Sequence, residues 1–350
     1  MSTRRVFLKT MVLAAGSLYA QGCVRAGESN ASGAWRPAYA DLEDEGRLAA
    51  RVEQALARYE YCDLCPHECG VNRLRGEKGF CEARGRAVVF SHGPHYGEEL
   101  PLVGRGGSGT IFFSHCNLRC VFCQNWPIAH LGRGDEVDDA GLARMMLDLQ
   151  RRGCHNINLV TPTHFMPSIL GAVRLARHQG LHLPLCYNTG GYETVESIRL
   201  LDGIVDIYLP DLKFMDREAS RRYVIQGRGD YPAMAQEAIR EMHRQVGELV
   251  VDESGVARRG LMIRHLVMPN RVAGTREFVD WVARNLTLGT YVNIMSQYRV
   301  EHMAFDYETI SRAITSQEYV EAMEWALQAG LRNLDQRSLS QLEIHRRMLS

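Results

Sequence analysis

This sequence of 350 residues has no net charge, because 41 lysine and arginine residues balance 41 aspartate and glutamate residues. Without a surplus of positive charge, the chain exerts no general attraction on nucleic acid or on an anionic membrane surface. The composition therefore argues against a dedicated nucleic-acid-binding protein. The 45% of hydrophobic and 23% of charged residues also argue against disorder, and the length allows one large α/β domain with a small appendage.

An apolar run long enough to span a bilayer is missing as well. The run Met11–Ala20 is too short for a stable anchor. It follows Thr3–Lys9, whose paired arginines resemble a twin-arginine (Tat) export signal. Cys23 follows a small residue, as in a lipoprotein processing site, although Gln21 fits that pattern imperfectly. Residues 1–23 are thus expected to be a Tat-like signal segment for export to the cell envelope; the alternative is a basic N-terminus on a cytoplasmic protein.

Cysteine is too scarce for a disulfide scaffold, with ten residues in a chain of this length. Seven of the ten fall into two compact groups, within 62–81 and 116–123, which indicates metal binding rather than disulfides. Cys154 and Cys186 lie singly beside apolar runs, so we expect them to be packed thiols.

The chain divides by composition and periodicity. Val24–Pro37 shows little periodicity, whereas the apolar residues of 42–59 recur at helical spacing. The expected divisions are the signal segment 1–23, a linker and helix over 24–61, a cysteine-rich module over 62–104, the main domain 105–335, and a C-terminal tail 336–350.

Short apolar runs alternate with amphipathic helices in the main domain, a pattern typical of parallel strands joined by helical crossovers. The predicted strands are Gly109–Ser114, Ile157–Val160, Leu183–Tyr187, Val205–Leu209, Met262–Val267 and Tyr291–Met295. Six such units are too few for a closed eight-stranded barrel, and they fit a partial barrel or an open doubly wound sheet. In either architecture, ligands gather at the carboxyl ends of the strands.

The helices between these strands carry their own boundary signals. Asp138 is expected to cap the first helix and Gly153 to end it, while Ser168 and Gly180 bracket the next one. The buried stripe of the first helix is predicted to consist of Leu142, Met145, Met146 and Leu149.

Three cysteines, Cys116, Cys120 and Cys123, follow the first predicted strand with C-x3-C-x2-C spacing. Iron–sulfur clusters take cysteine thiolates as ligands, and a cubane needs four. Three thiolates leave one iron open, as catalytic metal sites leave a position for substrate. The alternatives are three packed thiols, or a zinc site with His115 or His130 as fourth ligand.

The run Cys116–Cys123, with Phe122 before its last cysteine, resembles the signature loop of the radical S-adenosylmethionine (SAM) superfamily. Within it, the chain is similar to the pyruvate formate-lyase activating enzyme branch, and closer still to uncharacterised homologues with an N-terminal cysteine module. The resemblance covers 62–331. It implies a partial (β/α)6 barrel, a 4Fe–4S cluster on the three cysteines, and SAM bound to the open iron.

The resemblance also implies an activity. An electron from the reduced cluster would cleave SAM to a 5'-deoxyadenosyl radical that abstracts hydrogen, as in an oxidoreductase of the activating-enzyme type. A reductant such as flavodoxin or ferredoxin and a glycyl-radical partner protein are the expected partners, or else a different substrate. Arg271–Gly274 superficially resembles the glycyl-radical motif itself, but fits better as the loop after the fifth strand.

Several residues match positions that contact SAM in this superfamily. The resemblance assigns cofactor binding to Phe122, Thr163, Asn188, Thr189, Asp211, Lys213 and Arg264. Thr161–His164 stands where relatives have a glycine-rich turn, which leaves the contact to the SAM amino group to Thr163 or to backbone carbonyls.

These polar residues have structural alternatives. Asp211 and Lys213 would otherwise form a surface pair, and Arg264 would bridge a buried carboxylate. His164 would act as a hydrogen-bonding residue without catalytic work, although imidazole titrates near neutrality.

The second cysteine group is Cys62, Cys65, Cys69 and Cys81. Four ligands complete a tetrahedral metal site or an iron–sulfur cluster. An accessory cluster that relays electrons or binds substrate, a structural zinc, and disulfides formed after export all remain open. Competing functions for the whole chain are a non-catalytic electron carrier or metal-binding scaffold, which needs a fourth protein ligand on the main cluster, and a zinc-supported binding module.

Overall fold

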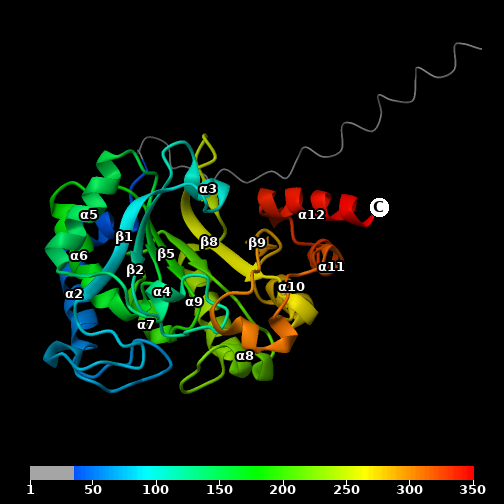
Figure 1. The fold of residues 1–350 in the computed structure, drawn as a ribbon. Helices are drawn as coiled ribbons and strands as arrows, with labels where there is room; N and C mark the ends of the chain where they lie inside the picture. The colour runs from blue at the N-terminus through cyan, green and yellow to red at the C-terminus, as the bar shows by residue number, and fades with distance from the viewer. Residues whose placement is uncertain (1–34) are drawn as a thin grey trace, which may run out of the picture.

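The computed structural model describes residues 35–350 as an α/β fold around one mostly parallel sheet (Figure 1). The strand order is β10-β9-β8-β6-β5-β4-β2-β1-β3. Every neighbouring pair from β10 to β2 is parallel, whereas β1 is antiparallel to both β2 and β3. The expected signal segment and Cys23 lie outside the described residues.

The strands are β1 (Ala87–His95), β2 (Ser108–Phe113), β3 (Asp135–Val137), β4 (Ile157–Val160), β5 (Leu185–Thr189), β6 (Ile207–Pro210), β7 (Val250–Val251), β8 (Ala257–Leu266), β9 (Tyr291–Met295) and β10 (Asn333–Leu334). The six predicted strands are therefore confirmed as β2, β4, β5, β6, β8 and β9. The fifth, β8, begins earlier than predicted because its first residues pair with the short β7.

The helices are α1 (Ala38–Asp44), α2 (Leu48–Ala57), α3 (Leu100–Val103), α4 (Trp126–Ala129), α5 (Asp139–Arg151), α6 (Met166–His178), α7 (Val195–Leu200), α8 (Arg217–Tyr223), α9 (Tyr231–Val246), α10 (Thr275–Asn285), α11 (Ser316–Gln328) and α12 (Gln336–Leu349). Short 3₁₀ helices lie at Arg73–Arg75, Thr163–Phe165, Pro269–Arg271, His302–Asp306 and Glu308–Ile310. Among these described residues, no helix is long and apolar enough to cross a membrane.

The two faces of the parallel strands pack against different partners. On one face, Tyr187, Leu261 and their neighbours belong to the large core shared with the helices. On the other face, Cys186 and Met262 belong to a separate small core that includes Leu102 of α3. Helices thus cover one face while the opposite face packs on itself, which is the interior of a partial barrel rather than a doubly wound sheet.

The predicted helix signals are confirmed for α5 and partly wrong for α6. The Asp138 carboxylate accepts from the Gly141 backbone N–H at 2.7 Å, and Gly153 follows the helix at φ 80°. Ser168 lies inside α6 rather than at its start, where its buried hydroxyl donates to the Gly85 carbonyl. The helix begins at Met166, and Pro167 occupies a first-turn position in which its missing N–H costs nothing.

Three segments differ from the expected divisions. Residues 42–59 form two helices rather than one, because the chain turns at Gly46 with φ 72°. The C-terminal half of the cysteine-rich module contributes β1 to the main sheet, so only 62–86 lies outside it. The expected tail 336–350 is helix α12, which packs against α11 at the far end of the molecule from α2 (Figure 1).

Candidate functional site

The three cysteines of the C-x3-C-x2-C run lie on the loop that follows β2. His115 and Arg119 adopt left-handed backbone conformations, with φ values of 70° and 46°. These two turns bend the chain back at each side of Cys116, whose sulfur accepts from the Leu118 N–H at 3.3 Å. The loop thus wraps around itself at the carboxyl end of the first parallel strand, where ligands are expected.

Two neighbouring segments hold this cluster loop in place. Val121 donates its N–H to the Tyr223 carbonyl at 3.0 Å, and its own carbonyl accepts from Met303 at 2.9 Å. Ile225 donates to the Leu118 carbonyl at 2.9 Å. Because these are backbone bonds on both sides of Cys120, the loop is fixed without using any cysteine side chain.

The thiols of this loop are in an apolar setting with one cation nearby. Burial raises the pKa of Cys116 and of Cys120, and raises that of Cys123 to about 12. The Lys213 ammonium acts in the opposite direction on each thiol. Such thiols keep their protons until a metal displaces them, because a thiolate is the metal-binding form.

Of the two histidines that could complete a zinc site, His130 is engaged elsewhere, whereas the His115 ring lies 6.5 Å from that of His164. The His130 ring nitrogen hydrogen-bonds the Cys120 carbonyl at 3.2 Å, and its ring contacts His302 at 4.4 Å. Burial lowers the pKa of His130 to about 4. Among residues 35–350, no group of three or more His, Cys, Asp or Glu side chains is arranged to hold a single metal ion. In a cubane, by contrast, each thiolate binds a different iron.

Phe122 is part of the loop, and its side chain packs in an aromatic cluster. Its ring meets Phe214 edge to face at 5.9 Å and approaches Tyr298 at 6.2 Å. Phe122 is 6% exposed, so it packs into the domain rather than standing free beside the loop.

Four of the predicted cofactor residues come together in the barrel interior. Arg264 on β8 donates from Nε to Asp211 at 2.7 Å and from Nη2 to Asn188 at 2.6 Å. Lys213 pairs with the other oxygen of the Asp211 carboxylate. The alternative of a surface pair is therefore wrong for Asp211 and Lys213, whose side chains are only 13% and 20% exposed. The structural alternative for Arg264, in which it bridges a carboxylate of the interior, is confirmed by its bond to Asp211.

Charge balance in this network favours the ionised forms. Burial alone would raise the pKa of Asp211, but Arg264 and Lys213 hold it below its usual value. Burial alone would lower the pKa of Lys213, but Asp211 and the Cys120 thiol raise it. The interior thus holds one fixed cation, Lys213, close to Cys120 and a second, Arg264, beside Asp211, and such cations suit a carboxylate such as that of an amino-acid cofactor.

Two further residues of this network, both glutamates, were not predicted from the sequence. Glu98 and Glu99 lie between β1 and α3, and are 9% and 3% exposed. A Glu98 oxygen lies 3.7 Å from Arg264, and Glu99 accepts from Asn293 at 2.8 Å. Helical or strand periodicity could not have identified these glutamates, because they lie in a turn. The sequence shows only two adjacent acidic residues before an apolar run.

Thr163 and Thr189 do not join Asn188 and Arg264. Both hydroxyls instead donate to one oxygen of the buried Glu193 carboxylate, and the distance from the Thr163 hydroxyl is 2.7 Å. The second oxygen of this carboxylate has no hydrogen-bond partner. Burial raises the pKa of Glu193 to about 7, against the effect of the two hydroxyls. Sequence reasoning missed Glu193, which lies four residues beyond the end of a strand without a distinctive neighbour.

His164 is a buried structural residue, as its alternative stated. Its ring nitrogen contacts the Ser114 carbonyl at 2.7 Å, and burial lowers its pKa to about 3. Cys154 and Cys186 are 3% and 0% exposed and free, so their prediction as packed thiols is confirmed. The segment at Arg271 follows β8 as a short loop into α10, also as predicted.

The cysteine-rich module is a compact loop structure around one arginine. Arg73 is 3% exposed and donates from Nε to the Cys62 sulfur at 3.0 Å and from Nη2 to the Cys81 sulfur at 3.1 Å. The Cys69 sulfur accepts from the Phe80 N–H at 3.1 Å. All nine cysteines of the described residues are free, so the disulfide alternative finds no pair here.

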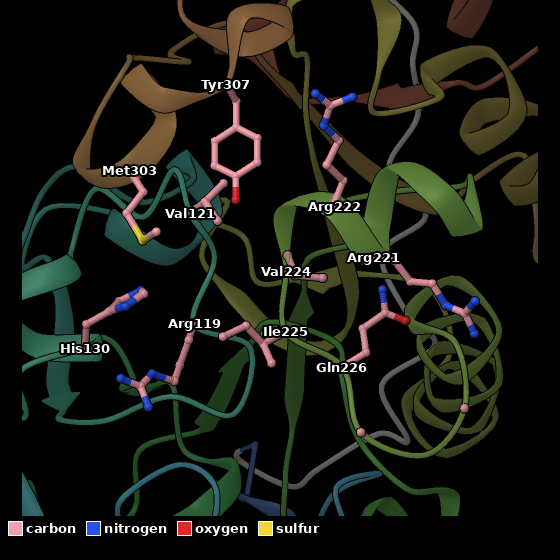
Figure 2. A pocket seen from close by; sticks show the side chains of 12 residues that line it. Arg119, Val121, His130, Arg221, Arg222, Val224, Ile225, Gln226, Met303 and Tyr307 are labelled. Atoms are coloured by element: carbon pink, nitrogen blue, oxygen red, sulfur yellow. The ribbon is translucent and has the colours of Figure 1, made fainter.

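A cavity of about 660 Å³ lies against the outer side of the cluster loop (Figure 2). Arg119 and His130 line it on one side, and Arg221 and Arg222 of α8 lie across from them, with Arg222 beside Tyr307. Asp230 neutralises Arg221 at 3.0 Å, whereas the Arg222 guanidinium lies 6.0 Å from the centre of the Tyr307 ring. The cavity therefore combines a basic rim with direct contact to the loop.

Known proteins match this arrangement. The model of the Radical SAM superfamily matches residues 110–256, which include the cluster loop. The uncharacterized protein MJ0674 of Methanocaldococcus jannaschii is 33% identical over 289 residues, which cover 80% of this chain and 78% of that protein.

Solved structures are similar at lower identity. The structure of anSMEcpe with bound AdoMet has 14% identity and a TM-score of 0.40, over 61% of this chain and 57% of that one. HydG, a maturase of the [FeFe]-hydrogenase, has 9% identity and a TM-score of 0.43, over 84% and 57%. The chain spans a little over half the length of these two solved chains. Given the match to MJ0674 and the superfamily match around the cluster loop, the chain belongs to the radical SAM superfamily, whose enzymes bind SAM and an iron–sulfur cluster.

Proposed function

We propose that this protein reductively cleaves SAM at a 4Fe–4S cluster bound by Cys116, Cys120 and Cys123, and that the resulting radical abstracts hydrogen from a substrate. The observation that carries the proposal is the donor set: three thiols on one backbone-fixed loop, with His130 engaged elsewhere. A site with three protein ligands leaves an iron position for an outside ligand. The cluster supplies the electron, and the chain's own residues supply binding and orientation.

The buried polar network is proposed to orient the cofactor. Lys213 presents a cation near Cys120 and Arg264 a second one on the other side of Asp211, and these would hold the carboxylate end of SAM. Asn188 is fixed by Arg264 and presents its amide to the same interior. Phe122 is proposed to limit the adenine side. Thr163 and Thr189 are left without this role, since their hydroxyls serve Glu193.

A glycyl-radical partner is the substrate class that the surroundings of the loop favour. The cavity beside Arg119 has a volume of about 660 Å³ and is lined by the loop residues Arg119 and Val121, and we propose that it admits a segment of the partner's chain. Its rim carries Arg221 and Arg222, which are exposed and would contact an acidic partner segment. A low-potential protein such as flavodoxin or ferredoxin is the proposed electron donor.

The test is anaerobic reduction of the reconstituted protein with SAM, followed by measurement of 5'-deoxyadenosine. We expect product from the wild type and a loss of more than about a hundredfold with Cys120→Ala, since one missing thiolate removes a cluster ligand. Cys154→Ala is the control, because Cys154 is also a buried thiol and lies before β4, at the end of the strands opposite the loop. An unchanged cluster spectrum on adding SAM would instead favour the non-catalytic electron carrier.

A further inference from the structure

We infer that Cys62, Cys65, Cys69 and Cys81 bind a second 4Fe–4S cluster, with Arg73 as its buried charge partner, and that this cluster exchanges electrons with the one on the main loop. The electron-exchange part rests on the proposed function. The presence of a cluster in the module does not, since it follows from the module's own side chains.

The first step is the charge of Arg73. A guanidinium stays protonated in proteins, and a buried charge requires a counter-charge. Among residues 35–350, Arg73 forms no ion pair with a carboxylate; its remaining donor goes to the Ala83 carbonyl at 3.0 Å. Its other two contacts are the sulfurs of Cys62 and Cys81. Two cysteine sulfurs thus stand where a buried guanidinium ordinarily has a carboxylate, and metal-bound cysteine sulfurs carry the negative charge that this position calls for.

The second step is that the other two thiols belong to the same site. A side-chain carbon placed on Gly79 would lie 2.7 Å from Arg73 Nη2 and 3.4 Å from the Cys69 sulfur. Cys69 thus lies beside the guanidinium that contacts Cys81. Cys65 is 7% exposed and lies three residues after Cys62 in the same loop. Four cysteines in one small loop module, three of them placed at Arg73 by these contacts, provide the complete ligand set of a four-thiolate metal centre.

The third step separates a cluster from structural zinc. A zinc ion and an oxidised 4Fe–4S core carry the same formal charge, so charge does not choose between them. The position of the module relative to the main loop favours a cluster. The ring of His67, a residue between Cys65 and Cys69, hydrogen-bonds the Asn117 carbonyl at 2.7 Å. Asn117 is bonded directly to Cys116. The same ring stacks on Phe80 at 3.9 Å, which fixes its orientation.

This contact gives a short path between the two cysteine groups. Three N–H donors also reach the module's sulfurs, two from Arg73 and one from Phe80. Hydrogen bonds to sulfur tune the reduction potential of a cluster. A structural zinc ion would gain nothing from such a path, whereas a redox centre uses it.

The electron count closes with an external donor. Cleavage of one sulfonium carbon–sulfur bond consumes one electron. In the proposed relay, the main-loop cluster gives that electron to SAM and regains one from the module's cluster, so that only the module's cluster ends oxidised by one. A low-potential one-electron donor protein then restores the module. No bond forms or breaks in this relay.

The first experiment counts metal. The full chain and the variant Cys116→Ala/Cys120→Ala/Cys123→Ala are reconstituted anaerobically with iron and sulfide. We expect the variant, whose module is untouched, to retain about four iron and four sulfide per chain. Adding Cys62→Ala/Cys81→Ala should remove them. A variant that binds zinc, or no metal, would overturn the inference.

The same samples separate this inference from the proposed function. If the main-loop variant keeps its iron while the wild type cleaves no SAM, the proposed function fails and the module's cluster stands. If the wild type cleaves SAM while the main-loop variant holds no iron, the opposite holds.

The second experiment tests the electronic contact. In the fully reduced wild type, electron paramagnetic resonance should show two spin-coupled clusters, a spectrum that is not the sum of the two single-site variants. A simple sum would refute the proximity. Arg73→Gln should make the module's cluster harder to reduce because a positive charge is lost, and Arg73→Lys should restore most of the shift. Equal potentials in all three proteins would refute the role of Arg73.

Discussion

Arg264 and Asp211 are joined across two neighbouring strands, with 2.7 Å between Arg264 Nε and an Asp211 carboxylate oxygen. The same carboxylate pairs with Lys213. One buried anion thus holds two buried cations, and Glu98 adds a second anion at 3.7 Å from Arg264. The cations are therefore preorganised in the interior before any ligand arrives, and a bound carboxylate would meet them already in place.

Asp211→Asn should destabilise the protein strongly. The substitution keeps the size of the side chain but leaves Arg264 and Lys213 with too little negative charge in a buried site, which costs about 3 kcal/mol or more. Chemical denaturation would measure the free energy of unfolding. Asp280→Asn removes one partner of an exposed pair with Arg284 and should change stability by less than about 0.5 kcal/mol. Equal effects of the two substitutions would show that the buried network carries no special charge requirement.

Glu193→Gln should change how stability depends on pH. Burial raises the pKa of Glu193 from its ordinary 4.5 to about 7. Because the folded-state pKa is the higher one, the stabilising contribution is complete below the ordinary pKa and is lost as the pH rises through about 7. Glutamine stays neutral, so the wild type should lose stability relative to Glu193→Gln between about pH 5 and about pH 8.

The control for this pH effect is Glu196→Gln, which changes an exposed carboxylate three residues away. It should leave the pH profile of the free energy of unfolding parallel to that of the wild type. A pH profile of Glu193→Gln that is also parallel to that of the wild type would contradict the raised pKa of Glu193.

The fold and the main cysteine triad were predictable from sequence, because both depend on local patterns. Parallel strands appear as short apolar runs, and the loop after β2 carries its three cysteines within eight residues. Arg73, Glu98 and Glu193 were not predictable. Each matters through a partner that folding brings to it, as when Arg73 meets Cys62 and Cys81, and no spacing rule connects such residues.

Met146→Ala and Met145→Ala form a matched pair that tests the predicted stripe of α5. Met146 is completely buried, whereas Met145 is only partly buried at the edge of the core. Met146→Ala should cost about 2–4 kcal/mol through the lost contacts and the cavity left behind. Met145→Ala should cost about half as much or less. Similar losses, read from denaturation midpoints, would contradict the burial difference between these two neighbours.

Gly79→Ala should disturb the module without touching any cysteine. The added carbon would lie 2.7 Å from Arg73 Nη2, and Arg73 cannot move aside easily because it is buried and donates to two sulfurs and one carbonyl. We expect the reconstituted variant to lose the module's share of iron and sulfide while the main loop keeps about four of each.

Gly93→Ala is the matched control for the crowding at Gly79. A carbon added there would meet only Arg152 Nη2 at 3.9 Å, an ordinary contact, and the backbone of neither glycine is in the left-handed region. Its metal content should equal that of the wild type. Iron lost equally from both variants would point to a general loss of folding, whereas full iron in Gly79→Ala would mean that the guanidinium of Arg73 need not stay beside Cys81 for the module to bind its metal.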